Sequence, residues 1–437
     1  MVSTSGRSRA TPAPRPVPDL ARRLRPSWLL LAAGTAAAVV AAAVDTPAAR
    51  AAAAQDWAPF VLVAGLLLVG LVAAHDGLFA AAGGLLASAT RSGVVLYLGS
   101  AVLVVVVTAV LNLDTSVAFL TPVLAAAAAR RGGGSRTLLA GCLLLSNAGS
   151  LLLPGSNLTN LIVLGHLHLP GSRFVARTGG AWLAGVLITA AVVAVVGRHD
   201  LRRGERAPRP ARPVLGIGAA AVLAAAVAVV TLRDPALAVA GVGVVAVAVR
   251  RWPPRVAGRD GQGRDQPPTT SGDLDQIHGP SHSRRPLVAR PTAGPHRLAT
   301  AAVVDALGLP TLVGLFGAAV ALGVLGRSWS GPHRLLGHAG SWETAAVGAL
   351  ASMAVNNLPA ASLLAARVVP HPVALLVGLD LGPNLLVTGS LAWLLWLRAA
   401  RAAGARPSIP ATIGLGWLAT PAAMAAALGM LSVTAPH

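Results

Sequence analysis

Residues 150–160 read SLLLPGSNLTN, and residues 380–396 read DLGPNLLVTGSLAWLLW. Both stretches place Pro, Gly, Ser and Asn inside long apolar runs. They also align with each other, because Ser150-LLLP-Gly155-Ser156 corresponds to Asn384-LLVT-Gly389-Ser390. A short internal repeat that falls on the same kind of interruption predicts a chain built from two related halves.

Two further interruptions come earlier in each half, and their order is the same. They are NLDT at 112–115, followed by Thr121-Pro122, and NNLP at 356–359. Non-helical backbone cannot face lipid, because each unpaired N–H or C=O group costs several kcal/mol there. Four matched interruptions therefore indicate an enclosed polar site, with the tips 112–115 and 356–359 facing each other near the membrane midplane. For any single interruption, a kink required only for helix packing is the alternative.

The composition excludes a soluble globular protein. Of the 437 residues, 54% are hydrophobic and 11% are charged, whereas soluble domains carry about 25% charged residues. The formal net charge is +20, without any Lys. The Arg residues lie almost entirely outside the apolar runs, where they orient loops rather than bind nucleic acid. The single cysteine, Cys142, excludes a disulfide framework and a Cys-cluster metal site, and no cofactor or metal is predicted.

The pattern of apolar runs predicts an all-α polytopic membrane protein with two inverted repeats. Each repeat combines a re-entrant hairpin with a broken transmembrane helix. The Arg distribution puts both ends of the hairpin 93–129 in the cytoplasm and opens the hairpin 342–369 outward. The N-terminus is then cytoplasmic, and the cell membrane is the expected location.

The predicted organisation has seven parts. They are a basic disordered arm (1–26), a first transmembrane helix and loop (27–56), the first repeat (57–197), a basic linker with two connecting helices (198–249), a disordered basic loop (250–297), the second repeat (298–432) and a tail (433–437).

Two acids lie within the interruptions, Asp114 and Asp380. An Asp at the centre of a membrane helix costs about 2.5–3.5 kcal/mol on insertion scales. It is tolerated where it faces a cavity and either titrates or binds a cation, so both residues are predicted to couple transport to an ion. The alternative is that each Asp caps the N-terminus of a half-helix.

Uncharged amides and hydroxyls accompany these acids and offer both donors and acceptors to a small polyhydroxy solute or oxyanion. About half of them are expected only to satisfy the broken backbone. The predicted substrate-binding residues are Asn112, Asn147, Ser150, Ser156, Asn157, Asn160, Asn356, Asn357, Asn384, Thr388 and Ser390. The predicted helix breaks are Pro122, Pro154, Gly155, Pro359, Gly382, Pro383 and Gly389.

These observations favour a cation- or proton-coupled carrier and leave two alternatives open. An intramembrane enzyme would use Asp114 or Asp380 as a base or metal ligand, but the chain lacks HExxH and paired acids in the breaks. A carrier that depends on a soluble ATPase subunit would dock it on the basic linkers, because the chain has no GxxxxGK[ST] motif of its own.

The interrupted segments resemble the arsenite/antimonite efflux permeases of the ion-transporter superfamily. The similar segments are NLDTS at 112–116, SLLLPGSNLTNL at 150–161, NNLPA at 356–360 and DLGPNLLVTGSLAWLLW at 380–396. The resemblance covers about residues 57–432 without the two linkers. It implies a two-repeat carrier that expels trivalent arsenic or antimony hydroxides in exchange for protons, alone or with an ATPase subunit, and it leaves a homodimer open.

Two positions depart from that family, which commonly has an acid where Asn147 stands and a Lys where Asn384 stands. The wider superfamily also contains sodium/dicarboxylate symporters and sodium/proton antiporters. The resemblance therefore leaves a sodium- or proton-coupled dicarboxylate or anion carrier as the alternative function. It also leaves sodium as the alternative coupling ion.

Overall fold

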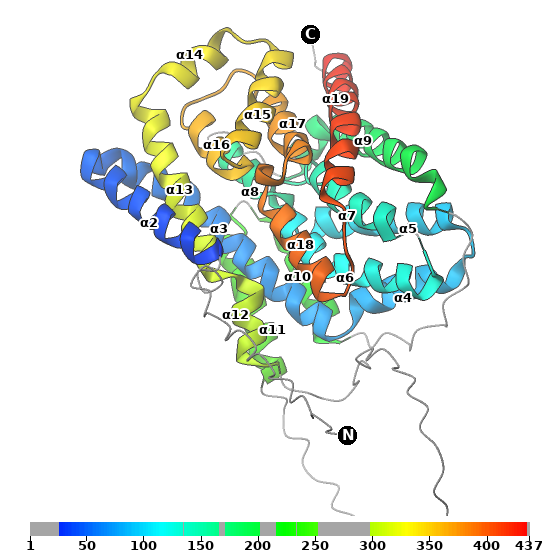
Figure 1. Ribbon diagram of the computed structural model, residues 1–437. Helices are drawn as coiled ribbons and strands as arrows, with labels where there is room; N and C mark the ends of the chain where they lie inside the picture. Colours follow the sequence, from blue (N-terminus) through cyan, green and yellow to red (C-terminus); the bar gives the residue numbers. More distant parts are fainter. Residues whose placement is uncertain are drawn as a thin grey trace, which may run out of the picture.

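The structure is a computed structural model that describes residues 26–133, 135–165, 171–201, 216–232, 234–251 and 298–434. Every regular element in these ranges is a helix (Figure 1). Seven of the helical segments are long and apolar enough to cross a membrane. They are α2, α3, α5, α6, α9, the consecutive helices α12 and α13, and α19. The predicted all-α polytopic fold is confirmed.

The helices preceding and forming the first half are α2 (Pro26–Val44), α3 (Thr46–His75), α4 (Leu78–Ala89), α5 (Gly93–Val110), α6 (Leu113–Arg131), α7 (Ser135–Gly149), η1 (Pro154–Ser156), α8 (Leu158–Leu164), α9 (Gly171–Val196) and η2 (Gly197–His199). Two helices connect the halves, α10 (Ile217–Thr231) and α11 (Ala236–Arg251). The second half contains α12 (Thr300–Leu307), α13 (Leu309–Ser328), α14 (Gly331–His338), α15 (Ser341–Val355), α16 (Asn357–Leu364), α17 (Pro372–Leu381), η3 (Gly382–Leu385), η4 (Val387–Gly389), α18 (Leu391–Ala402) and α19 (Ile409–Thr434).

Each half contains a helical hairpin followed by a broken helix. In the first half, α5 and α6 form the hairpin, and α7, η1 and α8 form the broken helix. In the second half the corresponding elements are α15 with α16, and α17, η3, η4 and α18. The element order thus repeats as the two interrupted stretches predict.

The two halves pack through reciprocal pairs of elements. The second hairpin arm of one half, α6, packs against the last part of the other broken helix, α18. In the same way α16 packs against α8, and the helices after the breaks, α9 and α19, pack against each other (Figure 1). Contacts that recur with the halves exchanged are those that a pseudo-two-fold axis produces.

Asn side chains start the half-helices after the breaks. Asn112 Oδ1 accepts a hydrogen bond from Thr115 N at 2.7 Å, and Asn157 Oδ1 accepts one from Thr159 N at 3.3 Å. Asn356 accepts from Leu358 N at 3.3 Å and has φ 79°, a positive value that is uncommon for a residue other than Gly. These caps satisfy backbone N–H groups that have no partner inside their helix.

Two predictions of local structure are wrong. Pro122 does not break a helix, because α6 continues through it and the break lies at Leu111 and Asn112. The loop expected before Trp57 is instead the first part of α3, which Asp45 caps by accepting from Ala48 N at 2.9 Å.

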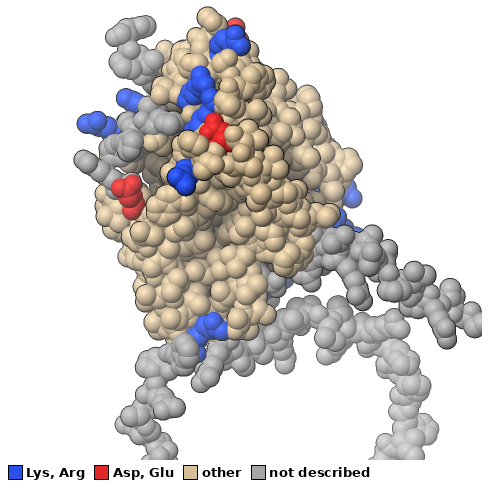
Figure 2. Space-filling model, turned by 90° about the vertical axis from the view of Figure 1, so that its left-hand side faces the viewer, with Lys and Arg blue, Asp and Glu red and all other residues tan. Residues whose placement is uncertain are grey.

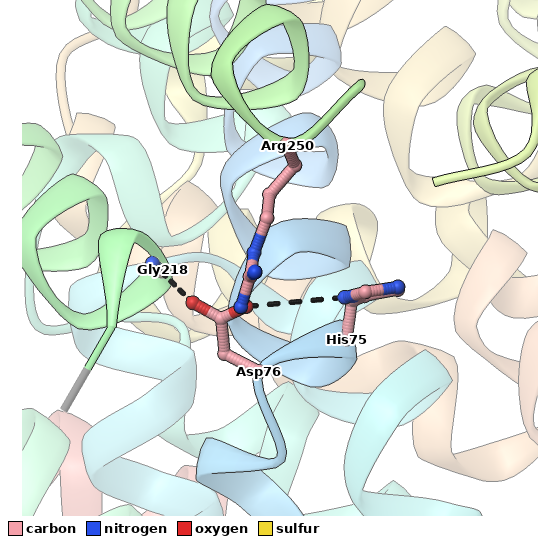
Figure 3. A network of polar contacts seen from close by, with 4 residues as sticks. All are labelled: His75, Asp76, Gly218 and Arg250. Carbon is pink, nitrogen blue, oxygen red and sulfur yellow. Dashed lines mark hydrogen bonds and ion pairs between the residues drawn. The ribbon is translucent and has the colours of Figure 1, made fainter. Parts of the chain in front are cut away.

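The two connecting helices are attached to the end of α3 by Asp76 (Figure 3). Its carboxylate accepts from Gly218 N, at the start of α10, at 2.7 Å, and from Arg250 Nε, in the last turn of α11, at 2.7 Å. His75 Nδ1 lies 3.9 Å from the same carboxylate. One buried acid therefore fixes the α10–α11 pair against the first half.

On one face of the molecule, charged side chains avoid a broad band of the surface. On the face drawn in Figure 2 they gather in the upper part and at the lower edge, with a wide uncharged area between them. This is the distribution expected for a lipid-facing belt. The predicted arm at 1–26, except Pro26, most of the linker 198–213 and nearly all of the loop 250–297 lie outside the described residues.

Candidate functional site

A small cavity lies where the four interruptions meet. It is lined by Leu113, Asp114, Asn157, Leu158, Leu315, Asn356, Asn357, Leu358, Ser390 and Leu391. Every one of these residues except Leu315 belongs to a hairpin tip or to a break. Elements more than 200 residues apart in the chain therefore converge on one space.

Four helices begin at this cavity. Residues 113–114 are the first two of α6, 157–158 span the start of α8, 356–358 span the start of α16, and 390–391 span the start of α18. Helix N-termini carry a partial positive charge and free N–H groups. The cavity is thus surrounded by positive helix ends, and no Arg is among the residues that line it.

Asp114 faces this cavity without a partner. Its side chain is 7% exposed, and no hydrogen bond or ion pair is found for its carboxylate in the described part of the chain. It does not cap α6, because Asn112 holds the capping position. The alternative, that Asp114 caps a half-helix, is therefore wrong. Its carboxyl group lies in the first turn of α6, near the partly positive N-terminus of that helix.

Asp380 is completely buried and joins the two halves. Its Oδ1 accepts from Asn157 Nδ2 at 2.7 Å and from Thr159 Oγ1 at 2.9 Å. Its Oδ2 has no hydrogen-bond partner in the described residues. Asp380 lies at the C-terminal end of α17, so it does not cap a half-helix N-terminus in its own segment.

Asn147 and Asn384 form a direct bond between the two broken helices. Asn147 Nδ2 donates to Asn384 Oδ1 at 2.8 Å, and Asn384 Nδ2 donates to Leu144 O at 3.2 Å. These are the two positions at which the chain departs from the arsenite permeases it resembles. The two residues that differ from that family are therefore hydrogen-bonded to each other and form a single pair.

Several predicted binding residues instead satisfy the broken backbone. Ser150 Oγ donates to Asn147 O at 2.8 Å, Ser156 Oγ to Ala109 O at 3.1 Å and Asn160 Nδ2 to Ser150 O at 2.7 Å. Thr388 Oγ1 donates to Met353 O at 2.8 Å, on the hairpin of the same half. Asn112, Asn147, Ser150, Ser156, Asn160, Asn384 and Thr388 do not line the cavity.

The remaining predicted binding residues do line it. Asn157, Asn356, Asn357 and Ser390 are cavity residues, and Ser390 Oγ is buried without a hydrogen-bond partner in the described residues. The predicted breaks Pro154 and Gly155 lie in η1, Gly382 and Pro383 in η3, and Gly389 ends η4. Pro359 lies in the first turn of α16, where its missing N–H has no helical acceptor to lose.

Indole groups cap the carbonyls that the breaks leave free. Trp393 Nε1 donates to Pro383 O at 2.8 Å, and Trp182 Nε1 donates to Gly149 O at 3.2 Å. The prediction omitted these residues, and it also omitted Thr159 and Leu315 from the site. Thr159 stands in the quoted SNLTN stretch, whereas nothing in its own sequence surroundings marks Leu315.

In the described residues, no group of three or more His, Cys, Asp or Glu side chains comes together. The arrangement supplies amides, hydroxyls, free N–H groups and one unpaired carboxylate. Such a set has the donors and acceptors that an oxygen-rich solute requires, and a carboxylate of the kind that takes up a cation or proton.

Broken helices around a polar cavity in a multi-pass helical protein are an arrangement found in secondary transporters. The chain belongs to the citrate transporter family, CitMHS, whose sequence profile matches residues 22–259. The structure is similar to that of the Alcanivorax borkumensis YdaH transporter, described as having an unusual topology. That similarity has a TM-score of 0.47 at 16% identity and covers 85% of this chain and 84% of the other. No curated protein matches the sequence. The match confirms the expected membership of a transporter family, and it does not extend to a family specific for arsenite.

Proposed function

We propose that this protein exports a small, weakly charged oxyacid, arsenite or antimonite first, in exchange for protons. The observation that supports this proposal most is the composition of the cavity. Its polar lining consists of Asp114, Asn157, Asn356, Asn357 and Ser390, beside four helix N-termini. A neutral trihydroxide loses little solvation on entering such a site and finds both donors and acceptors there.

The charge at the cavity opposes a highly charged anion. Asp114 lies beside the space that the solute would occupy, and no Arg offsets it among the lining residues. When Asp114 is ionised it repels an anion and competes for the same positive helix end. The resemblance of the four interrupted segments to arsenite permeases points to the same substrate class.

The two buried acids support proton coupling. An ionised carboxylate inside a membrane protein is costly unless a cation or donors offset it. Among the described residues, Asp380 has two donors on one oxygen and none on the other, while Asp114 has none. Each acid therefore gains from binding a proton, and sodium is the alternative ion at the same carboxylates.

The proposed carrier lies in the cell membrane with its N-terminus in the cytoplasm. The two halves then cross the membrane with opposite topology, so that their hairpins enter from opposite faces. The convergence of both hairpin tips on one cavity supports this arrangement.

Citrate is the second candidate substrate, because the matching family profile is described as a citrate transporter. Four helix N-termini could offset part of its charge, at about 0.3–2 kcal/mol each. Citrate would then need protons or cations on Asp114 and Asp380 before it could enter the cavity.

Uptake into everted membrane vesicles separates these functions. The panel contains arsenite, antimonite and citrate, each with and without a proton gradient and with and without sodium. We expect arsenite or antimonite to accumulate when a proton gradient is present, and an arsenite-sensitive host to gain resistance. Sodium- or proton-dependent citrate transport without any gain in resistance would replace the first candidate by the second.

A further inference from the structure

A polar cluster lies behind the cavity, at the opposite ends of two of the helices that line it. We name it the clamp cluster, and it consists of Gln55 and Asp56 on α3, Arg327 in the last turn of α13, and Ser362 on α16. None of these residues lines the cavity, and the sequence patterns that mark the breaks do not include them.

Gln55 ties two half-helices together. Its Nε2 donates to Ile162 O at 3.2 Å and to Ala365 O at 3.4 Å. The first carbonyl lies near the C-terminal end of α8, and the second immediately follows α16. One side-chain amide on α3 thus reaches the ends of a first-half helix and a second-half helix.

Arg327 holds Gln55 in place. Its Nη2 donates to Gln55 Oε1 at 2.5 Å and its Nη1 to Gly323 O at 3.0 Å. Arg367, just beyond α16, donates to Arg327 O. A guanidinium group at the C-terminal ends of α8 and α16 is favoured by their partial negative charge.

Asp56 contributes a buried acid to the same cluster. The residue is 1% exposed, and its Oδ2 accepts from Ser362 Oγ, on α16, at 3.1 Å. Its Oδ1 is buried without a hydrogen-bond partner in the described part of the chain. A buried carboxylate with an oxygen that accepts no hydrogen bond costs free energy. A contact that served packing alone would not require such a group.

The geometry of α8 and α16 connects the clamp cluster to the cavity. The helices have 7 and 8 residues, so each is only about 11 Å long at 1.5 Å per residue. Their first residues line the cavity, and their other ends are held by Gln55 and Asp56. A short helix moves as one piece, so a shift at one end displaces the other.

We propose that Gln55, Asp56 and Arg327 form a clamp that holds the distal ends of α8 and α16 together, and that its release accompanies opening of the cavity. Asp56 is a positioning residue in this scheme, because it acts through α16 and does not touch the solute. The inference rests on the proposed function only in taking the cavity as the transport site.

Two clamp variants and one matched control test it. Asp56→Asn removes the acid, and Gln55→Leu removes both carbonyl contacts while leaving Asp56 in place. The control is Asp76→Asn, because Asp76 directly follows the same helix and has a buried carboxylate that is bonded to Arg250 and Gly218. Its partners belong to α10 and α11, which do not line the cavity.

The first readout requires no substrate. A cysteine reporter, Ser390→Cys in a Cys142→Ala background, is labelled with an impermeant maleimide in vesicles. We expect both clamp variants to change the labelling rate by about fivefold, the change that about 1 kcal/mol produces. Asp76→Asn is expected to leave it unchanged. Wild-type labelling rates in both clamp variants, or an equal change in the control, would overturn the clamp.

The second readout is transport with Ser390 intact. We expect the clamp variants to lower the maximal rate by about fivefold while KM changes by less than about twofold, since the residues do not touch the solute. An unchanged maximal rate, or a change in KM alone, contradicts the proposal.

If the wild type carries no solute of the panel, the proposed function fails and the labelling result alone decides the clamp. If Asp56→Asn does not fold, Gln55→Leu provides both readouts.

Discussion

Asp114 and Asp380 interrupt apolar runs in similar ways, yet their surroundings differ. Asp114 lies at the cavity without a bonded partner, whereas Asp380 is fully buried and bonded to Asn157 and Thr159 across the interface of the two halves. A cavity-facing acid exchanges its proton with the transport path more directly than an enclosed one. We therefore propose that Asp114 carries the solute-linked proton and that Asp380 couples the two halves.

Replacing Asp114 by Asn tests the first assignment. The amide has nearly the same size but stays neutral, so it mimics the protonated acid permanently. We expect proton-driven transport to fall by at least about tenfold, equivalent to about 1.4 kcal/mol, and its dependence on pH to disappear, while the protein still inserts and folds. Transport is measured in vesicles at mildly acidic and mildly alkaline pH.

The control for Asp114 is Glu343→Gln, because Glu343 lies in the first turn of α15, outside the cavity lining, and accepts a hydrogen bond from Gly340 N. Wild-type rates and wild-type pH dependence in Asp114→Asn would show that Asp114 has no part in coupling.

Thr159 tests the surroundings of Asp380. Thr159→Val keeps the shape but removes one of the two donors to a buried carboxylate, which costs about 1.5–3 kcal/mol for a charged partner. Thr159→Ser keeps the hydroxyl. We expect thermal unfolding in detergent to occur at a lower temperature for Thr159→Val than for Thr159→Ser. The opposite order would mean that the bond to Asp380 does not stabilise the fold.

The residues of the site were predictable from the sequence only in part. Pro, Gly and Asn inside apolar runs mark where a helix stops, so Asn157, Asn356 and Ser390 could be selected. Which of them face the cavity depends on tertiary contacts, as the bond of Thr388 to Met353 O shows. Asp56 was missed because the segment before Trp57 was taken for a loop.

At the scale of elements, the missed start of α3 had a local signal. Asp45-Thr46-Pro47 is a capping residue followed by Pro in the first turn, a common N-terminal pattern. The high Ala content of 48–54 gave no apolar periodicity, which concealed the helix. Pro122 is the opposite case, because it predicts a break where the helix continues. Membrane helices tolerate Pro where neighbouring helices and side chains compensate for the lost hydrogen bond.

The close packing of α19 against the second broken helix can be tested by substitution on α19. A methyl group at Gly416 would lie 1.9 Å from Asn384 O, so Gly416→Ala must displace α19 or η3. We expect a loss of about 1–3 kcal/mol from overpacking, together with slower transport, because Asn384 bonds to Asn147. Stability is measured by thermal unfolding and transport in vesicles.

Gly414 supplies the matched control on the same helix. A methyl group there meets nothing within 4 Å, so Gly414→Ala should be neutral or slightly stabilising in a helix. Equal stability of the two variants would show that α19 is not closely packed against η3 at Gly416.

At the scale of the whole molecule, the sequence predicts two halves but not how they meet. The short alignment between 150–156 and 384–390 identifies the repeat, and local caps determine where half-helices begin. The bonds between Asp380 and Thr159 and between Asn147 and Asn384 join residues 221 and 237 positions apart. No local pattern encodes such pairs, because they depend on how α6, α8, α16 and α18 pack reciprocally.

The orientation of the halves yields the last prediction. If the repeats are inverted, Gly133, which follows the first hairpin, is cytoplasmic, and Gly337, which precedes the second hairpin, is external. The two rules that set topology disagree at Gly337, since the nearby Arg334 favours the cytoplasm and only the inverted repeat places it outside.

A methyl group meets nothing within 4 Å at either glycine, so single cysteines there in a Cys142→Ala background should not disturb the fold. With impermeant maleimide, we expect Gly133→Cys to react in everted vesicles and Gly337→Cys in intact cells. Reaction of both from the same side would mean that the hairpins enter from one face, and that Arg334 rather than the repeat determines the topology.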